Sequence, residues 1–215
     1  MSAYFITATG TGIGKTFTTC ALLHANPNAA GYKPLISGYD DSTDTDTAQI
    51  IAAMGRGTPD LVSPWRFSAP LSPDMAAMRE NRQLTCRELV EWTHKVIDQS
   101  RPTLIETVGG LMVPLNSQHT TRDWMKACAL PLILVTGSYL GTISHTLTTL
   151  EAARSAGLKV HALIINESEQ SPVPLEETRA SIAAHATDIP LILAQPRVSS
   201  WREATVTASL WGMLK

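Results

Sequence analysis

The sequence is poor in the features that mark several large classes of protein. Its 215 residues include three cysteines, Cys20, Cys86 and Cys128, with no Cys-x-x-Cys spacing. This pattern predicts small buried or half-buried side chains in a reducing compartment, not a disulfide framework. The longest apolar run, residues 129–135, contains a proline and is too short to span a bilayer. No charged segment followed by an apolar stretch opens the chain, so we expect a soluble, cytoplasmic protein without a membrane partner.

Charge and familiar catalytic motifs are equally sparse. Seventeen basic residues stand against nineteen acidic ones, with no long run of either sign. This balance lacks the electrostatic footprint of a nucleic-acid binder. The six histidines form no H-E-x-x-H or H-x-x-E-H pair, so no zinc site is expected. A G-x-S-x-G motif is also missing, which leaves a serine hydrolase without support.

What the chain does contain is a repeated alternation of strand-like and helix-like segments. Strand-like runs begin at Tyr4 and recur at residues 31–38 (running into a loop), 102–106, 132–136, 160–166 and 189–193. Helix-like segments lie between them, at residues 17–24, around 50–54, after 85, and at 143–156 and 175–186. This order predicts an α/β fold with one doubly wound, mainly parallel sheet and helices on both faces. A length of 215 residues suits one domain, residues 1–215.

Two helix starts carry the spacing of a capping box. Thr85-Cys86-Arg87-Glu88 precedes an apolar-periodic stretch, and Ser200-Trp201-Arg202-Glu203 precedes the last predicted helix. Three prolines, Pro64, Pro70 and Pro73, predict an irregular connection between the first and second halves.

The first strand runs directly into a glycine-rich turn. Gly10, Gly12 and Gly14 alternate with other residues, and Lys15 and Thr16 open the first helix. Strand, glycine turn and helix start are the context of a phosphate loop, in which backbone N–H groups surround phosphate oxygens. The general pattern G-x-x-x-x-G-K-[ST] is incomplete, because Thr9 stands where its first glycine belongs. We predict a P-loop NTPase-like nucleotide site, with Lys15 on the β- and γ-phosphates and Thr16 on Mg²⁺.

Further candidates follow later strands. Ligands in parallel sheets bind outside the carboxyl ends of the strands, where Lys33, Glu106, residues 136–144 and Asn166 are expected. Glu106 ends an apolar strand, as a magnesium-binding acid of this fold would. Asp46 directly precedes an apolar-periodic segment and is the favoured second acid, although its neighbour Asp44 remains an alternative.

Together these segments resemble the ATP-dependent dethiobiotin synthetase family of P-loop enzymes. The likeness covers nearly the full chain and is carried by four stretches: residues 9–16, Gly31-Tyr32-Lys33-Pro34-Leu35-Ile36-Ser37-Gly38, residues 106–115 and residues 130–145. The second stretch matches the family's G-Y-K-P-x-x-S-G segment and is the most specific. The resemblance implies a homodimer that closes a cyclic urea on 7,8-diaminononanoate with CO₂ (or bicarbonate) and MgATP.

The resemblance also implies roles for single residues. Lys15 and Lys33 would stabilise negative charge, with Lys33 nearest the carbamate, and Thr11 and Ser37 would contact the substrate. Thr16, Asp46 and Glu106 would hold Mg²⁺. The nucleotide set is expected to comprise Gly12, Ile13, Gly14, Lys15, Thr16, Phe17, Asp46, Glu106, Thr107, Val108, Gly109, Asn166, Pro196, Arg197, Val198 and Glu203. The substrate carboxylate would meet Gly141, Thr142, Ile143 and Ser144 across the dimer interface.

The chain departs from the family pattern at several positions. Ala8, Gly10 and Ile13 replace a glycine, an aspartate and a valine of the loop, and Ser144 replaces an asparagine. Two other hypotheses stay open. One is a different P-loop amidoligase, and the other is a ParA- or MinD-like switch, which would carry an extra lysine where this chain has Gly10.

Overall fold

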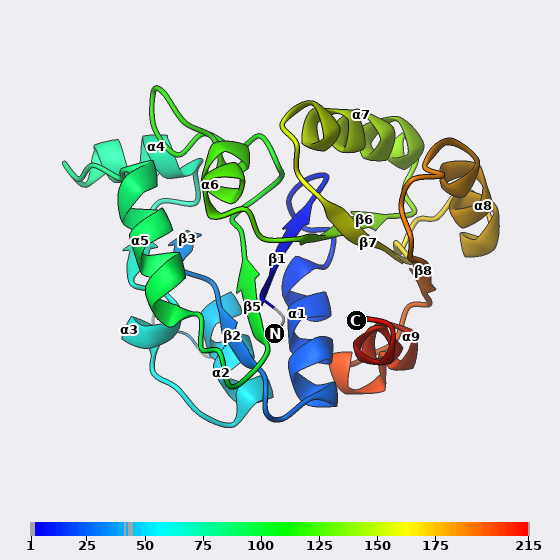
Figure 1. Ribbon diagram of the computed structural model, residues 1–215, viewed down its shortest axis with the longest axis horizontal. Helices are drawn as coiled ribbons and strands as arrows, with labels where there is room; N and C mark the ends of the chain where they lie inside the picture. Colours follow the sequence, from blue (N-terminus) through cyan, green and yellow to red (C-terminus); the bar gives the residue numbers. More distant parts are fainter. Residues whose placement is uncertain (1–2, 41, 43–44, 215) are drawn as a thin grey trace.

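A six-stranded parallel sheet forms the centre of the computed structural model, which describes residues 3–40, 42 and 45–214 (Figure 1). The strand order is β2-β5-β1-β6-β7-β8, and every neighbouring pair is parallel. In chain order the strands are β1 Ala3–Ala8, β2 Ala30–Tyr32, β5 Thr103–Glu106, β6 Leu132–Gly137, β7 Val160–Asn166 and β8 Ile192–Gln195. The predicted doubly wound parallel sheet is confirmed.

Helices cover both faces of this sheet, and the apolar side chains of the strands are buried on both sides. On one face Phe5, Ile105 and Leu134 belong to a core shared with α5 (Cys86–Val96), α6 (Thr121–Cys128), α7 (Thr142–Ser155) and α8 (Leu175–His185). Their neighbours Ile6 and Ile133 belong to the opposite core, with α1 (Lys15–Ala25), α2 (Asp46–Met54) and η2 (Leu210–Gly212). Successive strand residues point to opposite faces, so near-continuous apolar strands satisfy both cores.

At residues 31–38 the predicted short strand ends before Lys33, as expected, but the predicted loop after it contains a further strand that belongs to another sheet. The first sheet contains β2, and a second sheet pairs β3 (Leu35–Ser37) with β4 (Trp65–Phe67) in parallel. The division falls at Lys33-Pro34, where proline lacks the N–H needed to continue a ladder. The predicted irregular connection after it is wrong in part, since it also contains α3 (Pro59–Val62) and α4 (Pro73–Arg79).

The two predicted capping boxes have different outcomes. At α5 the Glu88 backbone N–H donates to the Thr85 hydroxyl and the Thr85 N–H donates to the Glu88 carboxylate, as predicted. At Ser200 the box is absent: the Ser200 hydroxyl accepts from Arg202, and Glu203 accepts from Ser199. A three-residue 3₁₀ helix, η1 (Trp201–Glu203), stands there, and α9 (Thr205–Ser209) begins only after it.

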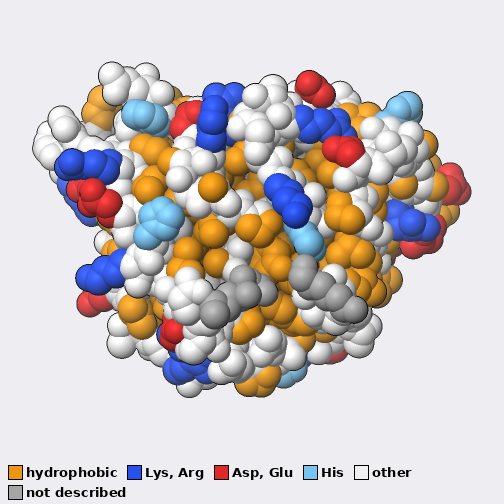
Figure 2. Space-filling view, viewed as in Figure 1, with side chains coloured by type: hydrophobic (Ala, Val, Ile, Leu, Met, Phe, Trp, Pro, Cys, Tyr) orange, Lys and Arg blue, Asp and Glu red, His pale blue; other side chains and the backbone are white. Residues whose placement is uncertain are grey.

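The surface in Figure 2 mixes lysine and arginine side chains with acidic ones over this face of the molecule, and they do not gather into one basic patch. Cys20 and Cys128 are buried and Cys86 is half-buried, all three with free thiols, as the sequence predicts. Among the described residues, no helix combines the length and the apolar character that a bilayer crossing requires.

Candidate nucleotide and metal site

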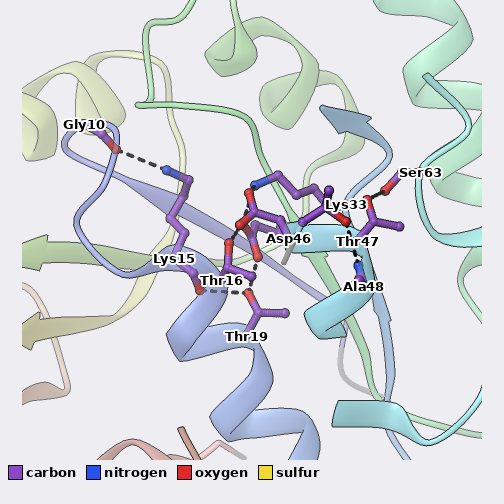
Figure 3. Close-up of polar contacts among 11 residues, drawn as sticks. Gly10, Lys15, Thr16, Thr19, Lys33, Asp46, Thr47, Ala48 and Ser63 are labelled. Carbon is purple, nitrogen blue, oxygen red and sulfur yellow. Dashed lines mark hydrogen bonds and ion pairs between the residues drawn. The ribbon is translucent and has the colours of Figure 1, made fainter. Parts of the chain in front are cut away.

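The predicted phosphate loop lies between the end of β1 and the start of α1. Gly12 and Gly14 adopt left-handed backbone angles, with φ of 73° and 92°, which side-chain-bearing residues rarely adopt. Gly14 is the N-cap of α1 and no side chain caps that end, so the first N–H groups of the helix are open to an anion. Lys15 extends back along the loop and donates to the Gly10 carbonyl at 3.1 Å (Figure 3).

Glu106 is the central acid of the site. It ends β5, is fully buried, and both of its carboxylate oxygens have hydroxyl donors from α1. The Thr16 hydroxyl donates to Oε1 at 2.7 Å, and the Thr19 hydroxyl donates to Oε2 at 2.7 Å. Sequence reasoning missed Thr19, although its position three residues after Thr16 puts both on one face of the helix. Thr19 therefore holds the orientation in which Glu106 presents Oε1 to the site.

Lys33 connects Glu106 to Asp46. Its ammonium group lies 2.9 Å from Glu106 Oε1 and also forms an ion pair with Asp46, the first residue of α2 (Figure 3). Burial alone would lower the pKa of Lys33, but the two carboxylates outweigh it and raise that pKa. Burial opposes ionisation of Asp46 too, yet the charge of Lys33 and its hydrogen bond hold the pKa of Asp46 below the usual value. Asp44, the alternative acid, lies outside the described residues.

The donor set fits a magnesium ion bound mainly through a nucleotide. One hydroxyl, from Thr16, and two carboxylates, from Asp46 and Glu106, lie within one hydrogen-bonded group. In the described part of the chain, no cluster of three or more His, Cys, Asp and Glu side chains could hold a metal unaided. Mg²⁺ commonly uses one or two carboxylates together with substrate phosphates and water, so two acids and a hydroxyl are sufficient.

A cavity of about 420 Å³ opens beside these groups. Its lining includes Thr11, Lys15, Lys33, Ser37 and Asp46, together with Gly12, Gly14, Thr16, Phe17, Ile36, Gln49, Val108 and Gly109. The structure thus brings the proposed catalytic lysines and the substrate candidates Thr11 and Ser37 to one space. The Ser37 hydroxyl is buried and has no hydrogen-bond partner within the described residues. An unpaired buried hydroxyl is costly, and a polar substrate group in the cavity would relieve that cost.

A second cavity of about 480 Å³ continues from the other side of the loop. It shares Gly12, Gly14 and Phe17 with the first, and Ile13, Asn166, Pro196, Arg197 and Val198 also line it. Tyr139, from the predicted segment 136–144, also lines it, and the sequence analysis did not include Glu167, Ser168, Glu169 and Gln195, which complete much of the wall. The Gln195 amide donates to the Pro196 carbonyl and accepts from the Thr207 backbone, which fixes the loop after β8.

Asn166 joins this second cavity to the phosphate loop. Its amide nitrogen donates to the carbonyls of Ile13 and Gly14, at 3.2 and 3.3 Å, and contacts Thr18 Oγ1 at 3.3 Å. Its amide oxygen is buried without a partner in the described part of the chain. The side chain therefore supports the loop with its nitrogen and leaves an acceptor for a ligand.

Three expected groups are placed apart from these cavities. Thr107 is fully buried and donates to the Thr7 hydroxyl, and Glu203 is exposed on η1, so neither lines a cavity. The turn at residues 141–144 does open α7 as predicted, with Gly141 at φ 96°. It lines a separate cavity of about 710 Å³, and Tyr139 belongs to the walls of both that cavity and the one beside Asn166.

Known proteins similar to this chain show the family to which it belongs. A family model described as an AAA domain matches residues 2–204. A curated relative from Acidiphilium cryptum, ATP-dependent dethiobiotin synthetase BioD, is 41% identical over 207 residues, which cover 90% of this chain and 93% of the relative. A protein of the same description from Methylobacterium nodulans is 43% identical over 203 residues, covering 86% and 90%. The chain belongs to the dethiobiotin synthetase family.

Solved structures with a similar fold are more distant in sequence than these members of the synthetase family. The cell division ATPase MinD of Pyrococcus furiosus has a TM-score of 0.62 and 17% identity, with both chains covered completely. A ParA family ATPase from Chlorobium tepidum has a TM-score of 0.55 and 13% identity, over 100% of this chain and 93% of its own. At these identities the likeness shows a shared fold and does not favour the switch hypothesis.

We predict that nucleotide affinity falls as pH rises past 8. Burial is the main cause that lowers the pKa of Lys15 to about 8, against the opposing attraction of Glu106. Above that pH the free protein carries a neutral Lys15, so binding of an anionic phosphate must take up a proton. Affinity for ADP, measured by calorimetry between pH 7.5 and 9.5, should then approach roughly a tenfold loss per pH unit. Lys15→Met should bind more weakly throughout and show a flat profile; an equally flat wild-type profile would contradict the prediction.

Proposed function

We propose that this protein closes the cyclic urea of dethiobiotin from 7,8-diaminononanoate, CO₂ and ATP. One observation carries the proposal: Lys15, Lys33, Thr16 and Asp46 line a single cavity beside a phosphate loop, and the buried Glu106 carboxylate is bonded to Lys33 and Thr16. Phosphoryl transfer needs positioning and charge neutralisation more than acid–base groups, and this cavity offers both. The relatives' printed name supports the same conclusion.

The proposed reaction has three steps. One amine of the substrate adds to CO₂ and loses a proton, which gives a carbamate. A carbamate oxygen attacks the γ-phosphorus of ATP, ADP leaves, and a mixed carbamic–phosphoric anhydride forms. The second amine attacks the carbamoyl carbon, phosphate leaves, and the ring closes. Negative charge develops on the carbamate oxygens and on the oxygens of the leaving ADP and phosphate. The site must therefore supply fixed cations.

Lys33 is assigned to the carbamate and Lys15 to the phosphates. Lys33 pairs with Asp46 and Glu106, so contact with a carbamate requires it to give up part of this pairing. Thr16, Asp46 and Glu106 would hold Mg²⁺, which would neutralise charge on the β- and γ-phosphates. The same ion would compensate the two carboxylates that Lys33 leaves. The free Ser37 hydroxyl and Thr11 are assigned to the substrate.

Base recognition is assigned to the cavity beside Asn166. The Asn166 nitrogen is used by the loop, so its oxygen is the atom left to accept a hydrogen bond. An exocyclic amino group such as N6 of adenine satisfies it, whereas a carbonyl at that position repels it. Pro196, Arg197 and Val198 would border the base.

The substrate carboxylate is assigned to the start of α7 in a partner subunit of a homodimer. Residues 141–144 provide helix N-terminal N–H groups, which suit an anion, but line a cavity separate from the one at Lys33. That separation favours a carboxylate site that serves the other subunit. We place the reaction in the cytoplasm, which the three free thiols favour, and treat residues 1–215 as one domain.

Product formation with each substrate omitted in turn tests the proposal. Dethiobiotin, detected by mass spectrometry, should require the diamine, bicarbonate and MgATP together, and phosphate release should stop when the diamine is absent. Slow ATP hydrolysis that ignores the diamine and bicarbonate would instead indicate a switch.

Lys33→Ala should lower kcat by about a hundredfold or more, the scale for loss of a positioned charge-stabilising donor. The exposed Lys126→Ala on α6 provides a matched control with unchanged turnover. Because Lys33→Ala leaves Glu106 buried without its cation, folding is checked by circular dichroism and by ADP binding. A folded Lys33→Ala protein with near-normal kcat would show that Lys33 does not stabilise the carbamate.

Nucleotides that differ only at the base test Asn166. ATP should bind about tenfold more tightly than purine riboside triphosphate, which lacks the exocyclic amine, and GTP should bind more weakly still. Asn166→Asp is unsuitable as a selective test, because a carboxylate would face the carbonyls of Ile13 and Gly14 and weaken every nucleotide. Equal affinity of the wild type for all three would exclude base recognition by Asn166.

A further inference from the structure

Four threonine hydroxyls meet beneath the phosphate loop, and two of them, those of Thr136 and Thr146, belong to residues without an assigned role. Thr136, at the end of β6, is fully buried and lies 3.0 Å from the hydroxyl of Thr9, the residue that follows β1. Its hydroxyl is also 3.0 Å from that of Thr142 and 2.9 Å from that of Thr146, both on α7. This threonine cluster connects the first residue of the loop to the helix that begins at the opposite cavity.

The direction of each hydrogen bond follows from counting protons. Thr142 donates its single hydroxyl proton to the Gly137 carbonyl at 2.7 Å, so it accepts from Thr136. Thr136 then has no further proton, and Thr9 and Thr146 must donate to it. A hydroxyl has one proton and two lone pairs, so Thr136 is fully used, with one donated and two accepted bonds. Such a saturated buried hydroxyl holds its neighbours in a defined geometry.

The position of Thr9 gives this cluster a functional consequence. The Thr9 backbone N–H donates to Val135, and the chain then leaves the sheet toward Gly10 and Thr11. Gly10 provides the carbonyl that Lys15 contacts, and Thr11 lines the cavity with Lys33. The later part of the loop has its own supports, because α1 begins at Lys15 and Asn166 binds the carbonyls of Ile13 and Gly14. The early part therefore depends on Thr9 more than the later part does.

We propose that Thr136 is a positioning residue that sets the early part of the loop, residues 9–11, for the substrate end of the reaction. This inference rests on the proposed function. Loss of its hydroxyl releases the Thr9 side chain and leaves the Thr9 backbone N–H as the remaining hold, which displaces Gly10 and Thr11 and keeps the phosphate-binding donors at residues 14–16 in place. A displacement of about 1 Å at a reacting group costs up to a hundredfold in rate, even when ligand affinity is largely kept.

Thr136→Val and Thr136→Ser separate the hydroxyl from the packing. Valine keeps the volume and loses all three hydrogen bonds, whereas serine keeps them. Thr149→Val is the control, since the Thr149 hydroxyl on α7 lies outside the threonine cluster and donates to the His145 carbonyl four residues earlier. We expect Thr136→Val to lower kcat/KM for the diamine about tenfold or more, with ADP affinity within about threefold of wild type. Serine should restore kcat/KM, and Thr149→Val should leave both quantities unchanged.

Hydrogen exchange supplies a readout that does not depend on the reaction. In Thr136→Val the Thr9 amide, which donates to the Val135 carbonyl, should exchange at least severalfold faster, while the Thr18 amide, which donates to the Gly14 carbonyl, keeps the wild-type rate. Unchanged exchange at the Thr9 amide, or a valine variant as active as the serine variant, would overturn the proposal. So would a loss of ADP affinity as large as the loss of kcat/KM, which would indicate general structural damage. If the wild type forms no dethiobiotin, the proposed function fails, while the exchange comparison still decides the positioning role.

Discussion

The buried ion pair between Lys33 and Glu106 is the interaction on which the site depends. Glu106 is fully buried and Lys33 almost so, and charges removed from water are stable only when they are paired and hydrogen-bonded. Every hydrogen-bonding atom of the Glu106 carboxylate is accordingly used, by Lys33, Thr16 and Thr19. Because these buried charges are stable only with their partners, the contacts hold the end of β2, the end of β5 and the start of α1 together at one edge of the sheet.

Parallel register explains why these residues meet. Tyr32 pairs with Ile105, so Lys33 and Glu106 come next on adjacent strands, and Glu106 pairs with Ile6 on the other side. With β5 between β1 and β2, one acid lies beside both the phosphate loop and the lysine. Pro34 then ends the ladder and sends the chain to the second sheet, whose β3 brings Ser37 to the same cavity. Chemistry at this edge is thus a consequence of strand order.

The phosphate loop borders the cavity at Lys33 and the cavity beside Asn166, and different groups support its two ends. Asn166 supports its later part from the nucleotide side, and the threonine cluster supports its first residue from the side of α7. Thr19, below the loop, orients the acid that the metal would approach. The groups that support the loop are mostly neutral hydroxyls and amides, which leaves the charged groups available to ligands.

The sequence by itself determined the alternation of strands and helices, the phosphate loop, and the placing of Lys33, Glu106 and Asn166 at strand ends, because each depends on local spacing. It failed at Ser200, where a helix-start pattern forms only a 3₁₀ turn, and after Pro34, where the predicted loop contains a strand of a second sheet. Only the tertiary structure decided that Lys33 pairs with both acids, that Thr107 and Glu203 lie away from the cavities, and that Thr9, Thr136, Thr142 and Thr146 meet. The reason is that strand order and helix packing bring together distant residues such as Thr9 and Thr136, which are 127 positions apart, and no local pattern records such contacts.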